Sequence, residues 1–469
     1  MTSVAHASRW QQGEVIELTI DELTNSGDGV GRWQDRVVFV ADAVPGDRLQ
    51  VRLTRVKPAY SHGKRLDILE PSSDRIRPAC IVADKCGGCQ WQAVAYSQQL
   101  QAKEQQVRSV LARLGGFETV EVRPVLAAPD PLRYRNKATY PLARGTSGTV
   151  KAGYYRKGTH QIVNLNQCPI QHEALNPLLV DAKETIKTRG WSLYNEKKHQ
   201  GRLRHLALRV GAHTGQTLLT LVTTGYLPDV KEQAEAWLET HSDLVGVCLN
   251  INSKQTNTVF GEDTRCLAGQ PYIEELFLGL RLQIQPTTFF QVNTIQAEAL
   301  VQVILDQLAL QGNETVIDAY CGIGTLSLPI AQRVARCIGI EAQAEAVAQA
   351  RQNATLNGLK NTDFFAGPVE HLLLEVSTQQ SAPIDVVVLD PPRKGCDLNV
   401  LNSLAKIKPA RIVYMSCNPA TLARDLKVLC GQYQLTLVQP ADFFPQTAHV
   451  ECVAFLERAD GADLAAGPV

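Results

Sequence analysis

Thr315-Val-Ile-Asp-Ala-Tyr-Cys-Gly-Ile-Gly-Thr325 is the stretch that decides the fold of this chain. An apolar, β-branched run ends at Asp318, a turn with two glycines follows, and a helical pattern begins directly after it. Two further runs typical of buried strands are Cys337–Glu341 and Asp385–Asp390, with helical segments between them. Strands that alternate with helices predict a parallel, doubly wound, Rossmann-like sheet, which we place over residues 286–458.

A ligand crevice is expected where these strands end. The two glycines let the backbone approach a ligand closely, and a new helix offers free N–H groups there. The three strands end in acids, Asp318, Glu341 and Asp390, and Glu341 is placed to accept hydrogen bonds from ribose hydroxyls. A helix-capping loop with incidental acids is the plain alternative. NAD is disfavoured because the full Gly-x-Gly-x-x-Gly is absent, so S-adenosylmethionine fits better.

A candidate nucleophile and a candidate base follow in the same region. The apolar run Arg411–Met415 leads to Cys417, just before a predicted helix whose N-terminal partial charge would favour thiolate. The final strand, His449–Leu456, places Glu451 among apolar neighbours, where burial raises a carboxyl pKa towards the range of a general base. A buried small residue and a structural salt bridge are the respective alternatives.

A cysteine, a carboxylate and a methyl donor together indicate methylation of C5 of uracil. That carbon is too poor a nucleophile to accept a methyl group unaided. A thiolate that adds at C6 makes C5 enolate-like, and a base must afterwards remove the C5 proton so that the thiolate can leave. Cys417 and Glu451 supply one candidate for each step.

Four cysteines upstream are candidate metal ligands. Cys80, Cys86 and Cys89 lie close together, with Gly-Gly inside the second pair, and Cys168-Pro follows 79 positions after Cys89. Proline after the last cysteine resembles iron–sulfur binding runs. A four-cysteine zinc site is the main alternative. The spacing differs from that of radical enzymes, so a structural cluster is expected.

The N-terminal part of the chain has a different sequence pattern. Residues 12–70 contain short strand-like runs separated by glycine turns, which predicts a small OB-like β-barrel. Gln92–Leu114 spaces Leu100, Val107, Leu111 and Leu114 as on one helix face, which predicts a connecting helix. Residues 71–285 mix strands and helices and form a predicted central α+β domain, so the whole chain is α/β and multidomain.

Composition narrows the class of protein. Lys+Arg and Asp+Glu both number 47, so the net charge is zero and nucleic acid is not expected to bind over the whole surface. No apolar run approaches the ~18 residues of a membrane span, and Met1–Trp10 lacks the apolar core of a signal peptide. We therefore expect a cytoplasmic protein without a membrane partner, whose twelve cysteines are not disulfide-bonded.

Two basic stretches stand out in this neutral chain. Residues 131–170 contain seven Lys or Arg and no acid, with tyrosines interleaved. If Arg133–Lys137 is a strand, alternation places three cations on one face. A second basic region, Arg52–Arg65, lies in the predicted barrel. Phosphate contact combined with base stacking explains such a mixture, so RNA binding is favoured over a merely solvated face.

Together these residues resemble a known family. The chain is similar to the RNA (uracil-5-)-methyltransferases, specifically the ribosomal RNA branch with an N-terminal TRAM domain and an iron–sulfur cluster. The resemblance covers about residues 13–456. Its motifs are Cys80…Cys86-Gly-Gly-Cys89, Pro286-x-x-Phe-Phe-Gln-Val-Asn293, Asp318-x-Tyr-Cys-Gly-x-Gly324, Leu389-Asp-Pro-Pro-Arg-x-Gly395, Ser416-Cys-Asn-Pro419 and His449-Val-Glu451.

The resemblance implies specific roles for residues of this chain. Those implied to contact S-adenosylmethionine are Gln291, Tyr320, Glu341 and Asp390. Cys417 is implied as the nucleophile, Glu451 as the base, and the cysteines 80, 86, 89 and 168 as ligands of a [4Fe–4S] cluster. Thr325 departs from the Asn or Asp that relatives often carry near the cofactor, which leaves a cofactor contact at this position in doubt.

The resemblance also implies a substrate. We expect methyl transfer to C5 of a uridine in 23S ribosomal RNA by a monomeric enzyme. A transfer RNA uridine is the alternative within the same chemistry, although the transfer RNA branch usually lacks the barrel and the cluster. A non-catalytic iron–sulfur RNA-binding or assembly factor is the alternative of a different class. Binding alone needs neither Cys417 nor Glu451, and this argues against it.

Overall fold

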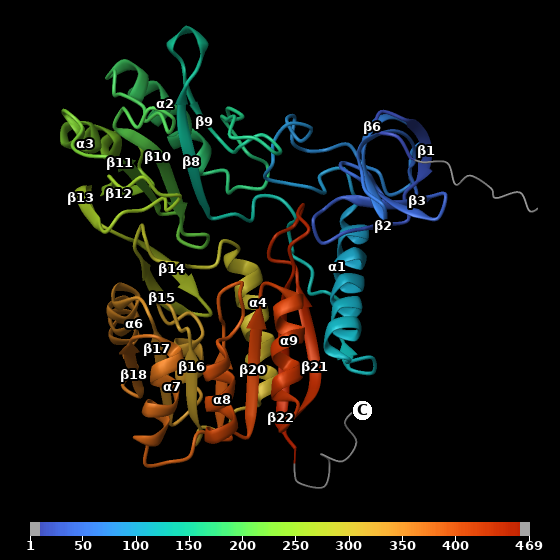
Figure 1. Cartoon of the computed structure of the whole chain (residues 1–469). Coiled ribbons are helices and arrows are strands. Elements are labelled where there is room, and N and C mark those ends of the chain that lie inside the picture. The colour runs from blue at the N-terminus through green and yellow to red at the C-terminus, as the bar shows by residue number, and fades with distance from the viewer. Residues whose placement is uncertain (1–9, 460–469) are drawn as a thin grey trace, which may run out of the picture.

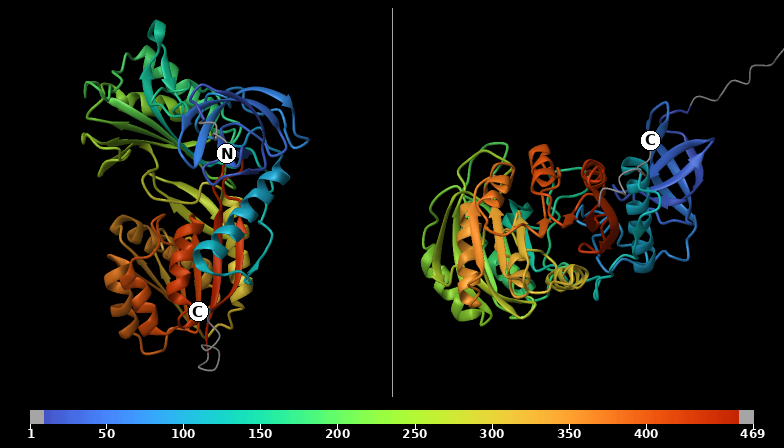
Figure 2. Two further views of the ribbon diagram at one scale, coloured as in Figure 1. Left: turned by 45° about the vertical axis from the view of Figure 1, so that its right-hand side comes forward. Right: turned by 90° about the horizontal axis from the view of Figure 1, so that it is seen from below.

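The structure is a computed structural model that describes residues 10–459. Figure 1 shows three parts: a small curled sheet at the N-terminus, a central sheet with two helices, and a larger C-terminal sheet with helices on both faces. A long helix, α1, runs from the N-terminal sheet down along the C-terminal one, as both views in Figure 2 show. The central and C-terminal sheets lie one above the other in Figure 1, with strands such as β20 pointing towards the central part.

The N-terminal sheet has six strands in the order β1-β5-β6-β4-β3-β2. It curls so that β3 passes close to β1, and a Cβ atom at Gly31 would lie 2.1 Å from the carbonyl oxygen of Thr19. Apolar residues of alternating positions fill its interior, among them Ile16, Leu18 and Val51. The strands are β1 Val15–Thr19, β2 Glu22–Leu23, β3 Gly29–Trp33, β4 Arg36–Val40, β5 Arg48–Val56 and β6 Tyr60–Glu70.

The predicted connecting helix is present as α1, Tyr96–Val110, followed by a π-helical turn at Leu111–Gly115. Val107 and Leu111 are buried as expected, but Leu114 is exposed. Two polar residues, Gln99 and Lys103, lie on the buried face instead. The helix therefore does not pack through a simple apolar stripe, because its buried polar groups have specific partners in the C-terminal part.

The central sheet has the order β13-β12-β11-β10-β8-β9. Its helices α2 and α3 pack against one face, where Leu206, Leu219 and Val247 form an apolar core with helix residues such as Leu179 and Trp237. The elements are β8 Lys137–Arg144, a 3₁₀ turn at Thr146–Gly148, β9 Val150–Ala152, α2 Leu175–Thr188, β10 Leu203–Val210, β11 Thr217–Thr223, α3 Val230–Thr240, β12 Leu244–Ile251 and β13 Asp263–Gly269. A separate hairpin, β14 Ile273–Phe277 and β15 Leu280–Ile284, leads to the C-terminal sheet.

The C-terminal sheet has eight strands in the order β18-β17-β16-β19-β20-β22-β21-β7. Strands β16 to β20 are parallel, and β22 is antiparallel to β20 and β21. The elements are β7 Glu121–Val122, α4 Thr294–Leu308, β16 Thr315–Ala319, α5 Ser327–Ala331, β17 Arg336–Glu341, α6 Ala344–Leu356, β18 Thr362–Ala366, α7 Val369–Thr378, β19 Val386–Leu389, α8 Leu398–Ile407, β20 Arg411–Ser416, α9 Pro419–Leu429, β21 Tyr433–Ala441 and β22 Glu451–Arg458. The predicted doubly wound sheet is thus confirmed, and sequence reasoning missed β18 and β21. It also missed β7, which joins this sheet although it lies within the residues assigned to the central domain.

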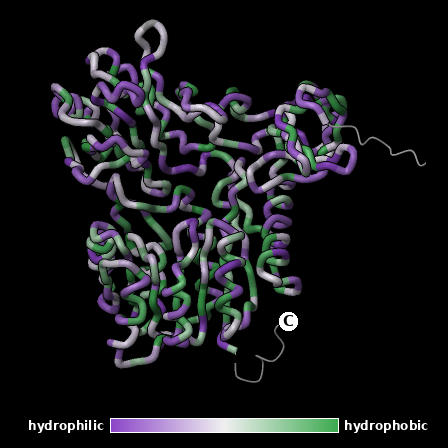
Figure 3. Tube along the Cα trace, viewed as in Figure 1, coloured by the Kyte–Doolittle hydropathy of each residue, from purple (hydrophilic) through white to green (hydrophobic). Residues whose placement is uncertain are grey.

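Successive side chains of the central strands point to opposite faces of this sheet, and apolar residues on each face pack against helices. Val388 and Val413 face one apolar core with α4 and α6, whereas Val387 and Ile412 face another with α7, α8 and α9. Figure 3 shows the hydrophobic colour concentrated along these strands. Both faces are covered, as parallel sheets require. No helix of residues 10–459 is long and apolar enough to cross a membrane.

Candidate active site

The glycine turn after β16 opens the site. Tyr320 and Gly322 both have positive φ, 72° and 55°, so the chain turns sharply at the end of the strand. The backbone N–H of Gly322 donates to the Glu341 carboxylate at 3.2 Å, and Gln343 N donates to the same side chain at 2.8 Å. Glu341 is therefore held at the edge of the turn.

A pocket lies above this turn. Three of the four predicted cofactor residues line it, Gln291, Tyr320 and Asp390, while Glu341 reaches it through Gly322. Thr325, which the sequence left in doubt, also lines the pocket. Sequence reasoning missed the apolar lining, to which α4 and the strand ends contribute: Phe289, Ala297, Leu300, Val301, Met415 and Phe443. Only Phe289 lies in a quoted motif, so only this residue had a local signal.

Within residues 10–459, the acids of the pocket form no ion pair with a cationic side chain. Asp318 accepts a hydrogen bond from Ser327 Oγ through Oδ2, whereas its buried Oδ1 has no partner. Burial, with Glu341 nearby, raises the pKa of Asp318 to about 7. Burial also raises the pKa of Asp390 to about 8, with Asp318 and Glu341 adding to the effect. A ligand that carries positive charge would stabilise these carboxylates, and S-adenosylmethionine, with its sulfonium and ammonium groups, fits this requirement.

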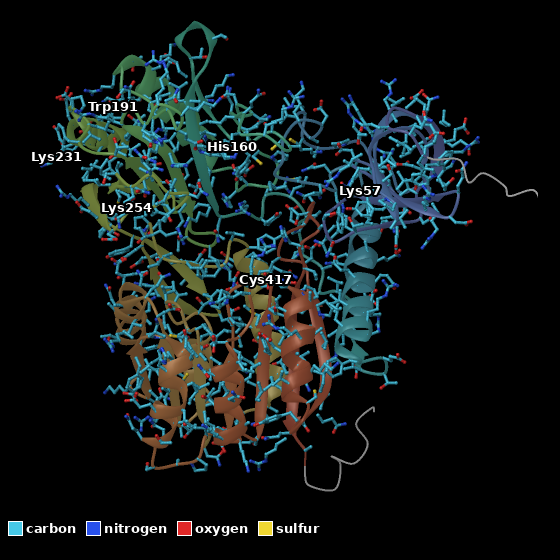
Figure 4. The ribbon with its side chains drawn as sticks, in the orientation of Figure 1. Lys57, His160, Trp191, Lys231, Lys254 and Cys417 are labelled. Carbon is cyan, nitrogen blue, oxygen red and sulfur yellow. The ribbon has the colours of Figure 1, made fainter. Side chains whose placement is uncertain are left out.

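Four adjacent strands bring the catalytic candidates to one edge of the sheet. In the order β16, β19, β20, β22 they supply Asp318, Asp390, Cys417 and Glu451. Ser416 pairs with Cys452 across β20 and β22, so the residues next in register are Cys417 and Glu451. Figure 4 shows Cys417 at the upper end of the C-terminal sheet, below the central part. The predicted nucleophile and base are thus neighbours beside the pocket.

The thiol of Cys417 differs from the expectation of a thiolate. Burial, with the carboxyl groups of Glu451 and Asp390 nearby, raises its pKa to about 11, against a weaker opposite effect of Arg393. Burial and Asp390 likewise raise the pKa of Glu451 well above its ordinary value. The backbone N–H of Cys417 does lower the thiol pKa, in the direction expected of a helix N-terminus, but desolvation and the neighbouring carboxyl groups outweigh it. The ligand-free protein therefore favours the thiol form of Cys417 at neutral pH.

Comparison with known proteins identifies the family. Residues 95–459 match the family model described as tRNA (Uracil-5-)-methyltransferase, and residues 9–66 match the TRAM domain. The chain belongs to the (uracil-5-)-methyltransferase family. It is an S-adenosylmethionine-dependent RNA (uracil-5-)-methyltransferase, and the curled N-terminal sheet is its TRAM domain.

Related proteins are similar to this methyltransferase over most of its length. An uncharacterized RNA methyltransferase of Nostoc sp. is 58% identical over 96% of this chain and 97% of that protein. Another, of Thermosynechococcus vestitus, is 54% identical over 96% and 99%. Among solved structures, Pyrococcus abyssi tRNA (uracil-54, C5)-methyltransferase in complex with S-adenosyl-L-homocysteine is 29% identical with a TM-score of 0.75, covering 94% of this chain and 99% of that one.

The methyltransferase also brings its four upstream cysteines together. Cys80, Cys86, Cys89 and Cys168 line one pocket, with Tyr154, Leu165 and Ile170 among its other lining residues. Burial raises the pKa of Cys89 to about 12 and that of Cys168 to about 11, and the neighbouring thiols contribute to both effects. Between residues 10 and 459, no three His, Cys, Asp or Glu side chains form a group that could hold one metal ion. The four predicted ligand cysteines thus come from two segments that are distant in sequence and line the same pocket.

The basic stretches of the methyltransferase fold differently from the expectation. Strand β8 begins only at Lys137, so Arg133 and Arg135 precede it and the predicted alternation does not apply. Arg133 pairs with exposed Asp130 at 2.7 Å. In the TRAM domain, Arg52 and Lys64 are exposed partners across β5 and β6. Nearby rings of Phe39, Tyr60 and His62 pack against one another, and Figure 4 shows Lys57 on the side of this domain towards the centre of the molecule.

Proposed function

We propose that this enzyme methylates C5 of a specific uridine in 23S ribosomal RNA through a covalent intermediate between Cys417 and C6 of the base. The observation that carries the proposal is the pairing of β20 with β22, which makes Cys417 and Glu451 neighbours beside a pocket lined by carboxylates. Binding alone would need neither a thiol nor a buried carboxyl group at this position. A non-catalytic assembly factor is therefore disfavoured.

The two residues act in sequence. Cys417 gives its proton to solvent water and the resulting thiolate sulfur forms a bond to C6, which moves the electron pair of the C5–C6 double bond to C5. S-adenosylmethionine supplies the methyl group that C5 takes up. Glu451 then removes the proton from C5, the double bond re-forms, and the bond between sulfur and C6 breaks. The raised pKa of Glu451 suits this step, because a carboxylate that prefers its protonated form is a stronger base.

We assign cofactor binding to Gln291, Tyr320, Glu341 and Asp390. The backbone contact of Glu341 with the glycine turn supports a role for this residue at the ribose hydroxyls. Asp390 and the orphan oxygen of Asp318 support binding of the positively charged end of the cofactor. Thr325 joins this set as a pocket residue, although we assign it no contact.

We assign a [4Fe–4S] cluster to Cys80, Cys86, Cys89 and Cys168. Four thiols line one pocket whose other walls are largely apolar, which supports the assignment. A cluster holds its four thiolates farther apart than a single ion does, so the lack of a single-ion group among residues 10–459 does not oppose it. A bound cluster would cross-link the segment before α1 to the segment before α2, so its contribution is structural. Zinc in the same four-cysteine set is the alternative that metal analysis distinguishes.

Ribosomal RNA is not the only candidate substrate. The relative from Pyrococcus abyssi is named as a tRNA (uracil-54, C5)-methyltransferase and matches almost the whole chain, so the N-terminal domain does not separate the two classes of RNA. A transfer RNA uridine is therefore the second candidate. We also propose a cytoplasmic, monomeric enzyme.

The decisive experiment is a map of 5-methyluridine in ribosomal and transfer RNA from a strain that lacks this protein. We expect one or more sites in 23S ribosomal RNA to lose the modification. Wild-type protein should restore it, whereas the Cys417→Ala variant should not. Loss confined to transfer RNA would establish the second candidate. An unchanged map in both kinds of RNA would contradict the proposal.

A further inference from the structure

Lys137 and Arg209 form an unusual pair in the central sheet. They are direct partners across β8 and β10, so their side chains project from the same face. Arg135 lies beside them, with its Nε donating to the carbonyl oxygen of Lys137 at 3.1 Å. In the described part of the chain, none of these three cations forms an ion pair with a carboxylate.

Arg209 has unused hydrogen-bonding capacity in a buried position. Its side chain is only 3% exposed. Nη2 donates to the carbonyl oxygen of Thr288 at 2.8 Å, whereas Nε and Nη1 have no hydrogen-bond partner among residues 10–459. A buried guanidinium with unpaired donors is costly, and two cations side by side add repulsion. The cluster is therefore incomplete without an anion.

Lys137 shows the same deficit. Its Nζ lies 5.2 Å from the centroid of the Phe260 ring, and it has no carboxylate partner among residues 10–459. Burial, with Arg209 and Arg135 nearby, lowers the pKa of Lys137 to about 6. Lys137 and Arg135 are both half-buried, whereas Arg209 is buried, so a ligand would reach the cluster from the side of these two residues.

The cluster lies next to the active site. Asn136, which precedes Lys137, donates through its side chain to the carbonyl oxygen of Gln291 at 2.9 Å. Thr288, the partner of Arg209, directly precedes Phe289. Phe289 and Gln291 both line the cofactor pocket, whereas Lys137 and Arg209 do not. An anion held by the cluster is therefore one loop away from the reacting base and separate from the cofactor.

We propose that Arg135, Lys137 and Arg209 bind a backbone phosphate of the substrate RNA close to the uridine that enters the active site. A phosphodiester supplies the acceptor oxygens that the buried guanidinium lacks, and its charge offsets the repulsion between the cations. Such a contact would hold the RNA strand beside the active site. The assignment of this phosphate site rests on the proposed function.

The test uses the full-length protein and a 5′-fluorescein-labelled oligouridine of 20 nucleotides, with binding followed by fluorescence anisotropy. Lys137→Gln should weaken binding about tenfold and reduce the slope of log K against log[salt] by about 0.7, the value for one contact with single-stranded nucleic acid. Thermal unfolding of this variant should occur at the same or a higher temperature, because a buried amine without a carboxylate partner has been removed. A purely structural lysine would instead lower that temperature.

The matched control is Lys231→Gln. Lys231 is an exposed residue of α3, the helix that covers the opposite face of the central sheet, and Figure 4 shows it at the outer edge of the molecule, away from Cys417. The same loss of charge there should leave the affinity and the salt slope unchanged. An equal loss in both variants would mean that only overall charge matters, which would overturn the proposal.

A second readout is the pH dependence of binding. The charged groups that face Lys137 are Arg209 on β10 and Arg135 before β8. A neighbouring phosphate favours the protonated lysine, so binding should take up a proton above pH 6, and the wild-type Kd should rise by up to tenfold per pH unit from pH 6 to 8. Lys137→Gln should show a flatter profile.

These results separate this site from the proposed reaction. Normal affinity, salt slope and pH profile in Lys137→Gln, with methylation intact, would refute the phosphate site alone. The expected binding defects in a protein that methylates no uridine would support the phosphate site and refute the proposed reaction.

Discussion

Lys103 Nζ lies 2.6 Å from Asp442 Oδ1, and neither side chain is exposed. Lys103 comes from the middle of α1, whereas Asp442 begins the loop that leads to Glu451 at the start of β22. Burial lowers the pKa of Lys103 and raises that of Asp442, and the attraction between the two opposes both effects. One buried ion pair thus ties the connecting helix to the segment that carries the candidate base.

Other parts of the molecule also form hydrogen bonds with this loop. The side chains of Gln99 and Gln446 are hydrogen-bonded at 3.2 Å, and Gln446 N donates to Gln99 Oε1 at 2.9 Å. Tyr134 OH donates to the carbonyl oxygen of Pro445 at 3.1 Å. Trp91 N donates to that of Gln446, and the Trp91 indole donates to Gly27 of the TRAM domain. The position of Glu451 therefore depends on α1, the TRAM domain and the central part together.

Replacing Lys103 by Met should destabilise the protein by about 3–5 kcal/mol, because it leaves the Asp442 carboxylate buried without a cation. The cost should shrink in acid. A carboxyl group whose folded-state pKa is raised destabilises the fold above that pKa, and this penalty disappears as pH falls below the unfolded-state value. Urea unfolding at pH 7.5 and at pH 5 measures both effects.

Two controls sharpen this measurement. Lys103→Met combined with Asp442→Leu should recover most of the loss, because no buried charge remains. Glu104→Ala removes only a partly exposed pair with Arg108 on the same helix and should cost no more than about 1 kcal/mol. A loss of under 1 kcal/mol in Lys103→Met would show that Asp442 finds another partner.

Substitutions at Cys417 and Glu451 should separate the first and last steps of the proposed reaction. Cys417→Ala should abolish both methylation and the covalent RNA adduct while RNA and cofactor still bind. Glu451→Gln keeps the shape but removes the base, so methyl transfer can proceed and then stall. Denaturing gels should show a methylated, slowly migrating RNA–protein species that accumulates in this variant.

A 5-fluorouridine substrate provides the control, because fluorine at C5 cannot leave as a proton does. It should trap the wild-type enzyme as the same kind of adduct. An adduct formed by Cys417→Ala would show that the nucleophile lies elsewhere. Turnover of Glu451→Gln at the wild-type rate without an adduct would exclude Glu451 as the base.

The sequence predicted the C-terminal sheet well because its signals are local. The apolar runs that end in Asp318, Glu341 and Asp390 are continuous in sequence, and parallel strands bring such ends to one edge. Cys417, which follows β20, could be placed near this edge for the same reason. Glu451 reaches the edge differently, because it begins β22, which runs antiparallel to β20. The weaker strands β18 and β21 were missed, since Thr362–Ala366 lacks a long apolar run.

Features that depend on distant partners could not be predicted. Lys103 is polar within a helix that the spacing of leucines suggested to be amphipathic, and its partner Asp442 lies 339 residues away. The raised pKa of Cys417 likewise arises from Glu451 and Asp390, which other strands contribute. The run Arg133–Lys137 was misjudged because Arg133 adopts a positive φ of 54°, which no alternation pattern reveals.

Protein purified without oxygen should be brown and contain about four irons, as the [4Fe–4S] assignment requires. Cys89→Ser should lose the colour and lower the unfolding temperature, because the cluster joins two distant segments. Cys430→Ser is the control, since this half-buried cysteine lies at the end of α9, outside the cysteine pocket. A colourless wild-type protein with one stoichiometric zinc would contradict the assignment.

Alkylation of Cys417 in the free enzyme should be slow at neutral pH and accelerate about tenfold per pH unit up to pH 10, since only the thiolate reacts and burial, Glu451 and Asp390 raise the thiol pKa to about 11. Arg393 acts in the opposite direction, so Arg393→Gln should slow the reaction further at each pH. Glu451→Gln removes the largest opposing charge and should accelerate it. Iodoacetamide labelling, with the Cys417 peptide quantified by mass spectrometry, distinguishes this thiol from the other eleven cysteines. A half-maximal rate at or below pH 8 would show that the free enzyme already holds a thiolate, and that substrate binding is not needed to activate Cys417.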